Sequence, residues 1–350
     1  MRLAFRPLTG PMGTDISSAH LPVHGGPILV CLDRSAFAEV CLLHAISLTR
    51  TFGRAITLAH VMEVRHERTG PQPSDALDWE FARQEAQGYL ERVEKEVSQA
   101  LGHPVEVRLE QGRPAERIVD LALEIAAEIT VLGCRGASGA PASSLGSTAQ
   151  QVLALARSSI FIAHSSSVVG AAVTPRRILV PLDGSIRAES VLPAAVRMAS
   201  DRGAELLLVH VVQDPLPTEL LPAPEDMALA RTLAERLESG AKRYLTHLQG
   251  QLAHECALIR TLVVRHAHER QCLLEMSQQE DTDLIILSAH GSACNSARSF
   301  GSVATYLLTH STVPVLVLQD LPGGDGHRVY GFDGVHLTPQ LRASYAPEHV

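Results

Sequence analysis

The sequence repeats itself once, and this repeat constrains the fold more than any other feature. The segment that begins at Ile28 returns at Ile178, and an offset of 150 positions pairs identical residues at intervals as far as Val61 and Val211. Further along, glycines and a serine recur at an offset of 155 positions, because five extra residues lie between the two matched stretches. Chance does not produce such an alignment, so the chain contains two copies of one domain.

Each copy alternates short apolar runs with amphipathic segments. In the first copy, strands are expected at residues 28–32, 56–61, 105–109, 129–132 and 160–163. Helices are expected at residues 36–51, at residues 75–101, from Pro114, and after a glycine-rich loop. Continuous apolar runs are typical of strands buried on both faces of a parallel sheet. We therefore expect an α/β fold of two tandem Rossmann-like domains, each an open, mostly parallel five-stranded sheet with helices on both faces.

The chain outside the two copies contains many prolines and glycines. We place the first domain at residues 27–165 and the second at residues 176–320, joined by a linker at residues 166–175. An N-terminal extension covers residues 1–26, and a C-terminal tail covers residues 321–350. No apolar run approaches the roughly 18 residues needed to span a membrane. We therefore expect a soluble, cytoplasmic protein.

Charge and cysteine content argue against several classes of protein. The chain has 30 Lys and Arg residues against 38 Asp and Glu residues, a net charge of -8, and no basic run that could follow a phosphate backbone. Nucleic acid is therefore not expected as a partner. The six cysteines show neither C-x-x-C pairs nor the spacing of a disulfide framework, so we expect free thiols in a reducing compartment and no structural zinc.

Candidate site residues follow the apolar runs, where a parallel sheet exposes the carboxyl ends of its strands. Asp33 and Asp183 follow the first strand of each copy, and Val61 and Val211 follow a histidine at the end of the second strand. A glycine-rich loop follows the fourth strand. Ligands of open α/β sheets bind at this edge, so these positions are the candidate ligand contacts.

The glycine-rich loop of the first copy has the composition of an anion site. It begins with Gly133-Cys-Arg-Gly136 and ends with Gly146-Ser147-Thr148. Glycines let the backbone approach a ligand, so successive N–H groups can converge on an anion. The final Gly-Ser-Thr opens a helix, where unpaired amides, hydroxyls and the helix dipole favour phosphate. Both copies keep the second loop glycine, the Gly-Ser pair and the aspartate while the residues between them differ, which favours phosphate binding over turn geometry alone.

The loop spacing G-x2-G-x9-G-S/T, with an aspartate after the first strand and His-Val ending the second, resembles the universal stress proteins, whose ATP-binding members carry this pattern. The resemblance covers about residues 27–165 and 175–320 and implies an adenine nucleotide alpha hydrolase-like fold. It implies a site for ATP, ADP or AMP, with Mg²⁺ as a further candidate, made of Asp33, Val61, Gly133, Arg135, Gly136, Gly146, Ser147 and Thr148. By the same resemblance, a weaker second site comprises Asp183, Val211, Ser288, Gly291, Gly301 and Ser302.

Within the implied first site, Asp33 and the backbone of Val61 would hold the adenine, and the glycine loop would line the ribose and phosphates. The second copy departs from this pattern, because Ser288 replaces the first loop glycine and Val303 replaces Thr148. If the position of Ser288 requires a glycine conformation, the serine costs about 1 to 2 kcal/mol. The valine removes a hydroxyl from the helix start. We therefore expect the first site to bind more tightly.

Other chemistries have less support. Neither of the two lysines of the chain lies in a glycine loop, and no P-loop or G-x-G-x-x-G pattern occurs. The His-x-His motif at residues 266–268 is more typical of solvated surface than of a metal site, so no metal is predicted. Cys134 lies in the first loop, where a redox role is conceivable. His60 and His210 could act as bases, although a buried structural role is favoured.

The glycine-rich loop offers amides and hydroxyls that can surround an anion. The sequence contains no set of residues typical of fast phosphoryl transfer. We expect a tandem universal stress protein that binds an adenine nucleotide and acts as a nucleotide-responsive regulator without efficient catalysis. Two alternatives stay open. One is a slow ATPase or self-phosphorylating enzyme, and the other is a nucleotide-free interaction module. The acceptor hydroxyls of the self-phosphorylating enzyme would be those of Ser143, Ser144, Ser147 or Thr148.

The fifth strands, expected at residues 160–163 and 315–318, would each leave an apolar edge if unpaired. The family resemblance implies that these strands pair with one another. We therefore expect the two halves to form a pseudo-dimer within one chain, and a homodimer through the remaining surface is left open.

Overall fold

The computed structural model describes residues 25–63, 73–134, 145–164, 174–213, 223–292 and 298–319. The first 24 residues, nearly all of the expected linker, and the C-terminal tail lie outside the described residues. The same holds for Arg135 and Gly136 of the first glycine loop and for Ser143 and Ser144. The domain limits therefore stay predictions.

The first half alternates strands and helices as predicted, with element ends that differ by at most about three residues. Its elements are β1 (Ile28–Cys31), α1 (Ala36–Phe52), β2 (Ile56–Glu63), α2 (Pro73–Leu101), β3 (Glu106–Gly112), α3 (Pro114–Glu124), β4 (Ile129–Gly133), α4 (Ser147–Leu155) and β5 (Ser159–Ala163). Local signals set several of these ends. Ser35 caps α1 by accepting a hydrogen bond from the Ala38 amide, and Gly53 ends α1 in a left-handed conformation, with φ of 67°.

The second half repeats this order with one interruption. Its elements are β6 (Arg177–Pro181), α5 (Ile186–Glu189), α6 (Leu192–Arg202), β7 (Glu205–Val212), α7 (Pro224–Leu252), β8 (Ile259–Arg265), α8 (Glu269–Gln279), β9 (Leu284–Ser288), α9 (Ser302–His310) and β10 (Val315–Leu318). Helices α5 and α6 together correspond to α1. Pro193 lies in the first turn of α6, and proline has no N–H for a preceding helical turn, so the helix is divided there.

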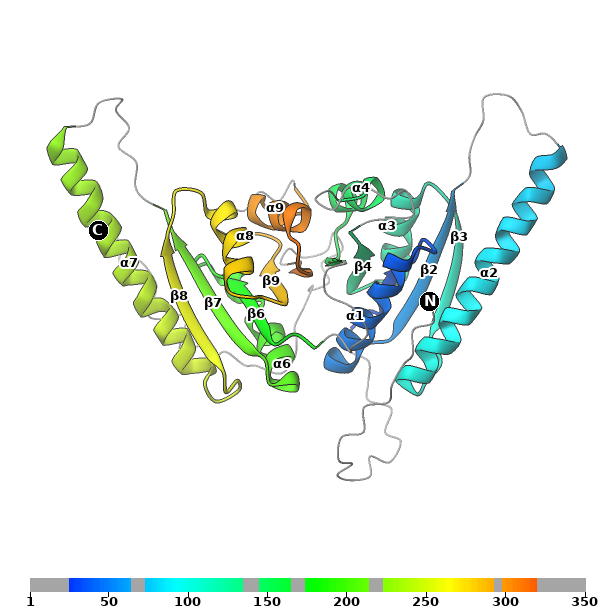
Figure 1. The fold of residues 1–350 in the computed structure, drawn as a ribbon, viewed down its shortest axis with the longest axis horizontal. Coiled ribbons are helices and arrows are strands. Elements are labelled where there is room, and N and C mark those ends of the chain that lie inside the picture. The colour runs from blue at the N-terminus through cyan, green and yellow to red at the C-terminus, as the bar shows by residue number, and fades with distance from the viewer. Residues whose placement is uncertain are drawn as a thin grey trace, which may run out of the picture.

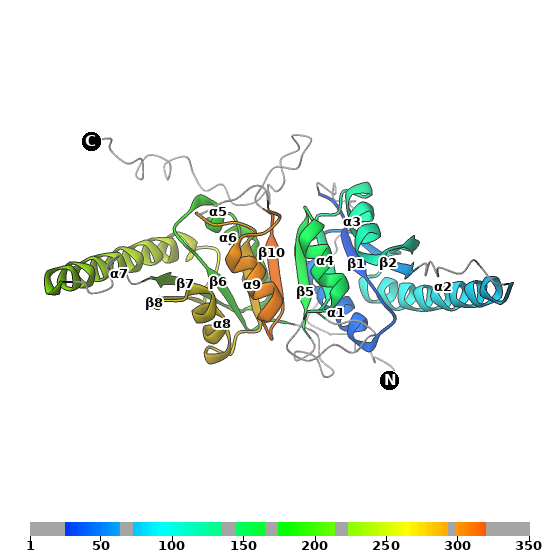
Figure 2. The ribbon, with the colours of Figure 1, turned by 90° about the horizontal axis from the view of Figure 1, so that it is seen from above.

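The strands of both halves form one sheet, in the order β3-β2-β1-β4-β5-β10-β9-β6-β7-β8. Neighbours within each half are parallel, and β5 and β10 pair antiparallel at the centre, with Ile162 opposite Val315 and Phe161 opposite Leu316. Figure 2 shows the two strands side by side at the middle of the molecule. The predicted fold class and the predicted pairing of the fifth strands are therefore confirmed, with the two sheets joined into one.

Helices cover both faces of this sheet (Figure 1). Helices α1, α2, α6 and α7 pack on one face, and α3, α4, α8 and α9 pack on the other. Each face has its own hydrophobic core, and both cores run through the junction: Phe161 and Leu316 belong to one, and Ile162 and Val315 to the other. Apolar burial therefore stabilises the association of the two halves. Within the described ranges, no helix is both long and apolar enough to cross a membrane.

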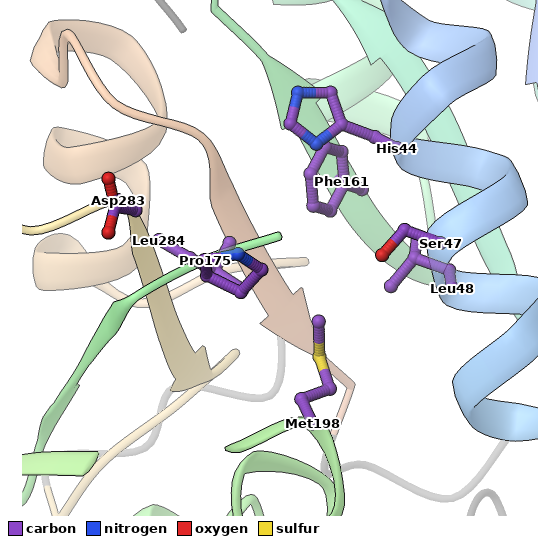
Figure 3. A pocket seen from close by; sticks show the side chains of 8 residues that line it. All are labelled: His44, Ser47, Leu48, Phe161, Pro175, Met198, Asp283 and Leu284. Atoms are coloured by element: carbon purple, nitrogen blue, oxygen red, sulfur yellow. The ribbon is translucent and has the colours of Figure 1, made fainter. Parts of the chain in front are cut away.

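A small cavity lies at the junction of the two halves (Figure 3). It has a volume of about 20 Å³, enough for one water molecule, and His44 of α1 lines it together with Pro175, at the end of the expected linker, and Met198 of α6. The His44 ring lies 4.9 Å from the ring of Phe161, measured between centroids. Burial lowers the pKa of His44 to about 4, and the nearby His164 adds to the effect. The imidazole of His44 is therefore neutral near pH 7.

Candidate functional site

The aspartate that follows the first strand of each half is held by a serine two residues later. In the first half, the amide and the hydroxyl of Ser35 both donate to Asp33 Oδ1, at 3.0 and 2.5 Å. In the second half, the Ser185 amide donates to Asp183 Oδ1 at 2.9 Å. Both serines also cap the following helix. The Asp-x-Ser segment thus fixes each carboxylate at the carboxyl edge of the sheet.

The residue between the aspartate and the serine differs between the halves in a way that affects the turn. This position has a left-handed backbone in both, with φ of 80° at Gly184 and 67° at Arg34. Glycine adopts this conformation without a steric cost, whereas a residue with a Cβ does not. The Arg34 side chain pairs with Glu85 at 3.0 Å, but both groups are exposed, so the pair contributes little. The first half therefore carries backbone strain that the second half lacks.

The histidine near the end of the second strand ties that strand to the aspartate turn. His60 Nδ1 lies 2.6 Å from the carbonyl oxygen of Leu32, the residue just before Asp33. Burial lowers the pKa of both His60 and the equivalent His210, so neither ring is poised to carry a proton near pH 7. The contact agrees with a structural role for His60. The following residue, Val61, is half-buried and packs on the core of the second face.

The two ends of the first glycine loop meet at the end of β4. The Cys134 amide donates to the Ala163 carbonyl oxygen at 2.9 Å, and the Gly146 amide donates to the Cys134 carbonyl oxygen at 2.8 Å. Gly146 is the N-cap of α4 and offers no side chain to its amides. Ser147 and Thr148 form the first turn, so their hydroxyls lie beside helix amides that have no partner within the helix. This helix start has the chemistry of an anion site.

The second half reproduces this backbone arrangement without strain at Ser288. The Gly301 amide donates to the Ala289 carbonyl oxygen at 2.7 Å, as Gly146 does to Cys134. Ser288 is the last residue of β9, and it is not among the non-glycine residues with positive φ, which in the described chain are Arg34, Ala126 and Asp281. The expected strain at Ser288 is therefore wrong, because the position is extended strand. Its hydroxyl donates to the His290 carbonyl oxygen at 2.6 Å.

The start of the second loop contacts the aspartate directly. The Ser292 amide donates to Asp183 Oδ2 at 2.6 Å. A Cβ on Gly291 would lie 2.3 Å from that oxygen, so only glycine permits this approach. Burial alone would raise the pKa of Asp183, but hydrogen bonds from Ser185 and Ser292 outweigh it and lower the pKa. In this half both carboxylate oxygens of Asp183 thus accept hydrogen bonds, Oδ1 from Ser185 and Oδ2 from the loop residue Ser292.

A polar hollow of about 220 Å³ lies beside the second site, where α8 and α9 begin. It is lined by Gln213, Ala267, His268, Glu269, Arg270, Ser302 and Val303. Glu269 is the notable member, because burial raises the pKa of its carboxyl and the charge of Asp183 raises it further. At the 155-residue offset, the first half has Pro114 instead. The second site therefore contains a carboxylate that has no counterpart in the first.

The fold brings most of the predicted residues to one edge of each half. Strands β2, β1 and β4 are parallel neighbours, and so are β7, β6 and β9, so the ends that carry the predicted residues lie together. The described residues concerned are Asp33, Val61, Gly133, Gly146, Ser147 and Thr148 in the first half, and Asp183, Val211, Ser288, Gly291, Gly301 and Ser302 in the second. Glu269 and Ser292 were not predicted. Glu269 could have been found from the sequence, because it aligns with Pro114 of the first half and is therefore a carboxylate particular to the second half.

The other motifs singled out in the sequence form no second site among the described residues. His266 and His268 contact each other, with the His268 amide donating to His266 Nδ1 at 3.0 Å. Among the residues that the structure describes, no group of three or more His, Cys, Asp or Glu side chains could hold a metal ion. Cys134 is buried, whereas reactive cysteines are partly exposed.

Comparison with known proteins agrees with the fold and the repeat. The sequence profile of the universal stress protein family matches residues 26–164 and again residues 174–319. Universal stress protein Rv2623 of Mycobacterium tuberculosis is 26% identical over 301 residues, covering 84% of this chain and 96% of that protein. A universal stress protein of Mycolicibacterium smegmatis is also 26% identical over 301 residues, covering 83% of this chain and 96% of its own length.

Solved structures show the same architecture across the two halves. The crystal structure of a universal stress protein from Archaeoglobus fulgidus superposes with a TM-score of 0.60 at 19% identity, covering 85% of this chain and 99% of that chain. This likeness supports the fold alone, whereas the two profile matches extend over most of the chain. The chain therefore belongs to the universal stress protein family, with one domain of that family in each half.

Proposed function

We propose that this tandem universal stress protein binds one adenine nucleotide tightly, in its first half, and acts as a nucleotide-responsive regulator. ATP is the first candidate ligand, followed by ADP and AMP. The observation that carries the proposal is the convergence of Asp33, the end of β2 and the start of α4 at one edge of the sheet. This edge offers a carboxylate acceptor for an amino group and helix amides for phosphate.

The start of α4 supports the phosphate part of the proposal. Gly146 leaves the first amides of the helix without a side-chain cap, and Ser147 and Thr148 add two hydroxyl donors. Amides and hydroxyls can surround phosphate oxygens without the strong positive charge of a lysine. Arg135 would add one cation from the loop. Where Mg²⁺ accompanies the nucleotide, it would neutralise part of the phosphate charge.

Asp33 supports the adenine part. Its carboxylate is oriented by Ser35, so it is pre-organised to accept a hydrogen bond from the exocyclic amino group of adenine. The Leu32 contact of His60 fixes the neighbouring end of β2, where the Val61 backbone lies. A rigid edge of this kind lowers the entropy cost of binding.

The same arrangement favours slow chemistry. Backbone amides and hydroxyls that hold a phosphate in its ground state do not by themselves stabilise the transition state more than the bound nucleotide. We expect hydrolysis far below the roughly 1 to 100 s⁻¹ of kinases. This sets the proposed regulator apart from the alternative of an ATPase.

Calorimetry on the full-length chain tests the proposal. The protein is freed of co-purified nucleotide, and ATP, ADP, AMP and GTP are titrated separately. We expect tight binding of at least one adenine nucleotide at about one equivalent, much weaker binding of GTP, and little ADP formed from ATP over hours. Absence of adenine nucleotide binding would overturn the proposal in favour of a nucleotide-free interaction module. ATP turnover above about one per second would overturn the non-catalytic part.

A further inference from the structure

An apolar stripe runs along the exposed side of α7, apart from the candidate site. Leu229, Leu233 and Leu237 are 68%, 45% and 46% exposed, and they follow one another at intervals of four residues. Residues four apart in a helix lie on the same side. Isolated exposed leucines are ordinary in soluble proteins, but a contiguous row is typical of an interaction surface.

The stripe turns away from the protein's own core. Ala234, Ala241 and Leu245 of α7 are buried and mark the direction in which the helix packs on the sheet. At about 100° per residue, Leu233 lies about 100° from this direction and Leu229 about 140° from it. Packing on the sheet therefore does not account for these two leucines.

The fold shared by the two halves does not require the stripe either. The 155-residue offset aligns Tyr89 with Tyr244 and buried Leu90 with buried Leu245, so α2 and α7 correspond residue by residue in this part. At the same offset, the three stripe leucines correspond to Ser74, Asp78 and Ala82 of α2. Helix α2 carries an exposed apolar pair of its own, Leu77 and Phe81, but at positions that correspond to Thr232 and Arg236 of α7. The row of three leucines is therefore particular to α7 and is not part of the shared fold.

The charges on the same side of α7 indicate what covers the stripe. Glu225 lies before the stripe and Arg243 lies after it, and both are exposed. At about 100° per residue, both lie about 80° to the same side of Leu233. If a second α7 runs antiparallel with Leu233 opposite Leu233, Glu225 of one helix comes beside Arg243 of the other. A parallel pair would keep Glu225 and Arg243 about 27 Å apart along the helix axes and leave both charges unpaired.

We propose that two copies of this chain form a dimer through the stripe, with the two α7 helices antiparallel and Leu233 at the twofold axis. Leu229 of each helix then packs near Leu237 of the other, and two Glu225–Arg243 pairs flank the contact. Figures 1 and 2 show α2 and α7 at opposite ends of the molecule, so a contact through α7 leaves the first half unobstructed. An isologous contact of this kind closes at two chains and does not propagate.

Sedimentation equilibrium of the full chain over a range of concentrations tests the proposed surface. We expect a dimer, and we expect Leu233→Glu to raise its dissociation constant at least 100-fold, because two carboxylates would face each other at the axis. Phe81→Glu on α2 alters a more exposed apolar residue and should leave the dimer unchanged. A monomer at all concentrations, as expected if residues 214–222 cover the stripe instead, would overturn the proposal. So would a dimer lost in Phe81→Glu but not in Leu233→Glu.

A charge exchange tests the antiparallel arrangement. Glu225→Arg and Arg243→Glu should each weaken the dimer about fivefold, because each places like charges together. The double variant restores both pairs with reversed signs and should recover most of the affinity. Circular dichroism of each variant checks that α7 remains folded. If the two losses of dimer affinity add up in the double variant, the antiparallel pairing is wrong.

Discussion

The two halves share one strand order and one backbone arrangement at the site edge, but they differ in what surrounds the aspartate. In the first half, Ser35 donates twice to one oxygen of Asp33. In the second, the Ser185 amide likewise donates to Asp183, and Glu269 adds a carboxylate near it. A duplicated scaffold can thus keep its geometry while side chains at its edge alter its affinity for an anion.

The physical reason to expect tighter nucleotide binding at the first site differs from the one that the sequence suggested. Strain at Ser288 does not distinguish the halves, because that residue is extended strand. The remaining differences are Val303 in place of Thr148 and the extra charge of Glu269. Both disfavour nucleotide in the second half, so we still expect the first site to bind more tightly, on different physical grounds.

The largest expected effect is a difference in nucleotide affinity between variants of the two aspartates. Asp33→Asn should raise the dissociation constant of the adenine nucleotide about 10- to 100-fold, because hydrogen bonds to charged groups contribute roughly 1.5 to 3 kcal/mol. Asp183→Asn should change tight binding less than about twofold. Calorimetry on both variants measures the difference. Equal losses would mean that the halves contribute equally to binding.

The next effect concerns His44, whose equivalent in the second half is Ala194. The pKa of His44 is lowered from 6.5 to about 4 by burial, so the unfolded state binds the proton first as the pH falls. Stability is fully present above about pH 6.5 and is lost as the pH falls toward 4. Between pH 7 and pH 5 this histidine should cost about 2 kcal/mol of unfolding free energy.

Urea titrations at both pH values check this effect. His44→Leu should be less sensitive to acid than the wild type by about that amount. His103→Gln alters an exposed histidine and serves as the control. An unchanged acid sensitivity in His44→Leu would contradict the assignment.

A smaller effect is expected when the extra charge of the second site is removed. Glu269→Gln should strengthen nucleotide binding there about five- to tenfold, which corresponds to roughly 1 kcal/mol of relieved repulsion. The number of nucleotides bound at high concentration should then approach two per chain. Glu255→Gln removes an exposed charge and is the matched control. If both variants behave alike, Glu269 does not decide occupancy.

The smallest effect concerns the left-handed turn position. Arg34→Gly should raise the free energy of unfolding by up to about 1 kcal/mol, because the strain of a Cβ is removed while some chain entropy is lost. Gly184→Ala should lower it by about 1 kcal/mol at the equivalent place. Thermal unfolding of the two variants compares them directly. A loss of stability in Arg34→Gly would show that its pair with Glu85 matters more than the backbone strain.

Much of the fold could be predicted because its signals are local. Apolar runs and amphipathic segments identified the strands and helices, and Ser35 and Gly53 marked the ends of α1. The aspartates and loop glycines were found because parallel strands place their carboxyl ends at one edge. Strain at Ser288 was predicted wrongly, because the sequence shows which residue replaces glycine but not the backbone angle at that position.

The sequence by itself determined the tandem repeat, the alternation of strands and helices, and the residues that follow each strand, because periodicity and turn residues act on near neighbours in the chain. Tertiary structure alone decided which groups meet across large separations. The register of β5 on β10, the approach of Ser292 to Asp183 past Gly291, and the burial of His44 at the junction are of this kind. Such contacts depend on how whole elements pack, and packing is a property of the complete fold.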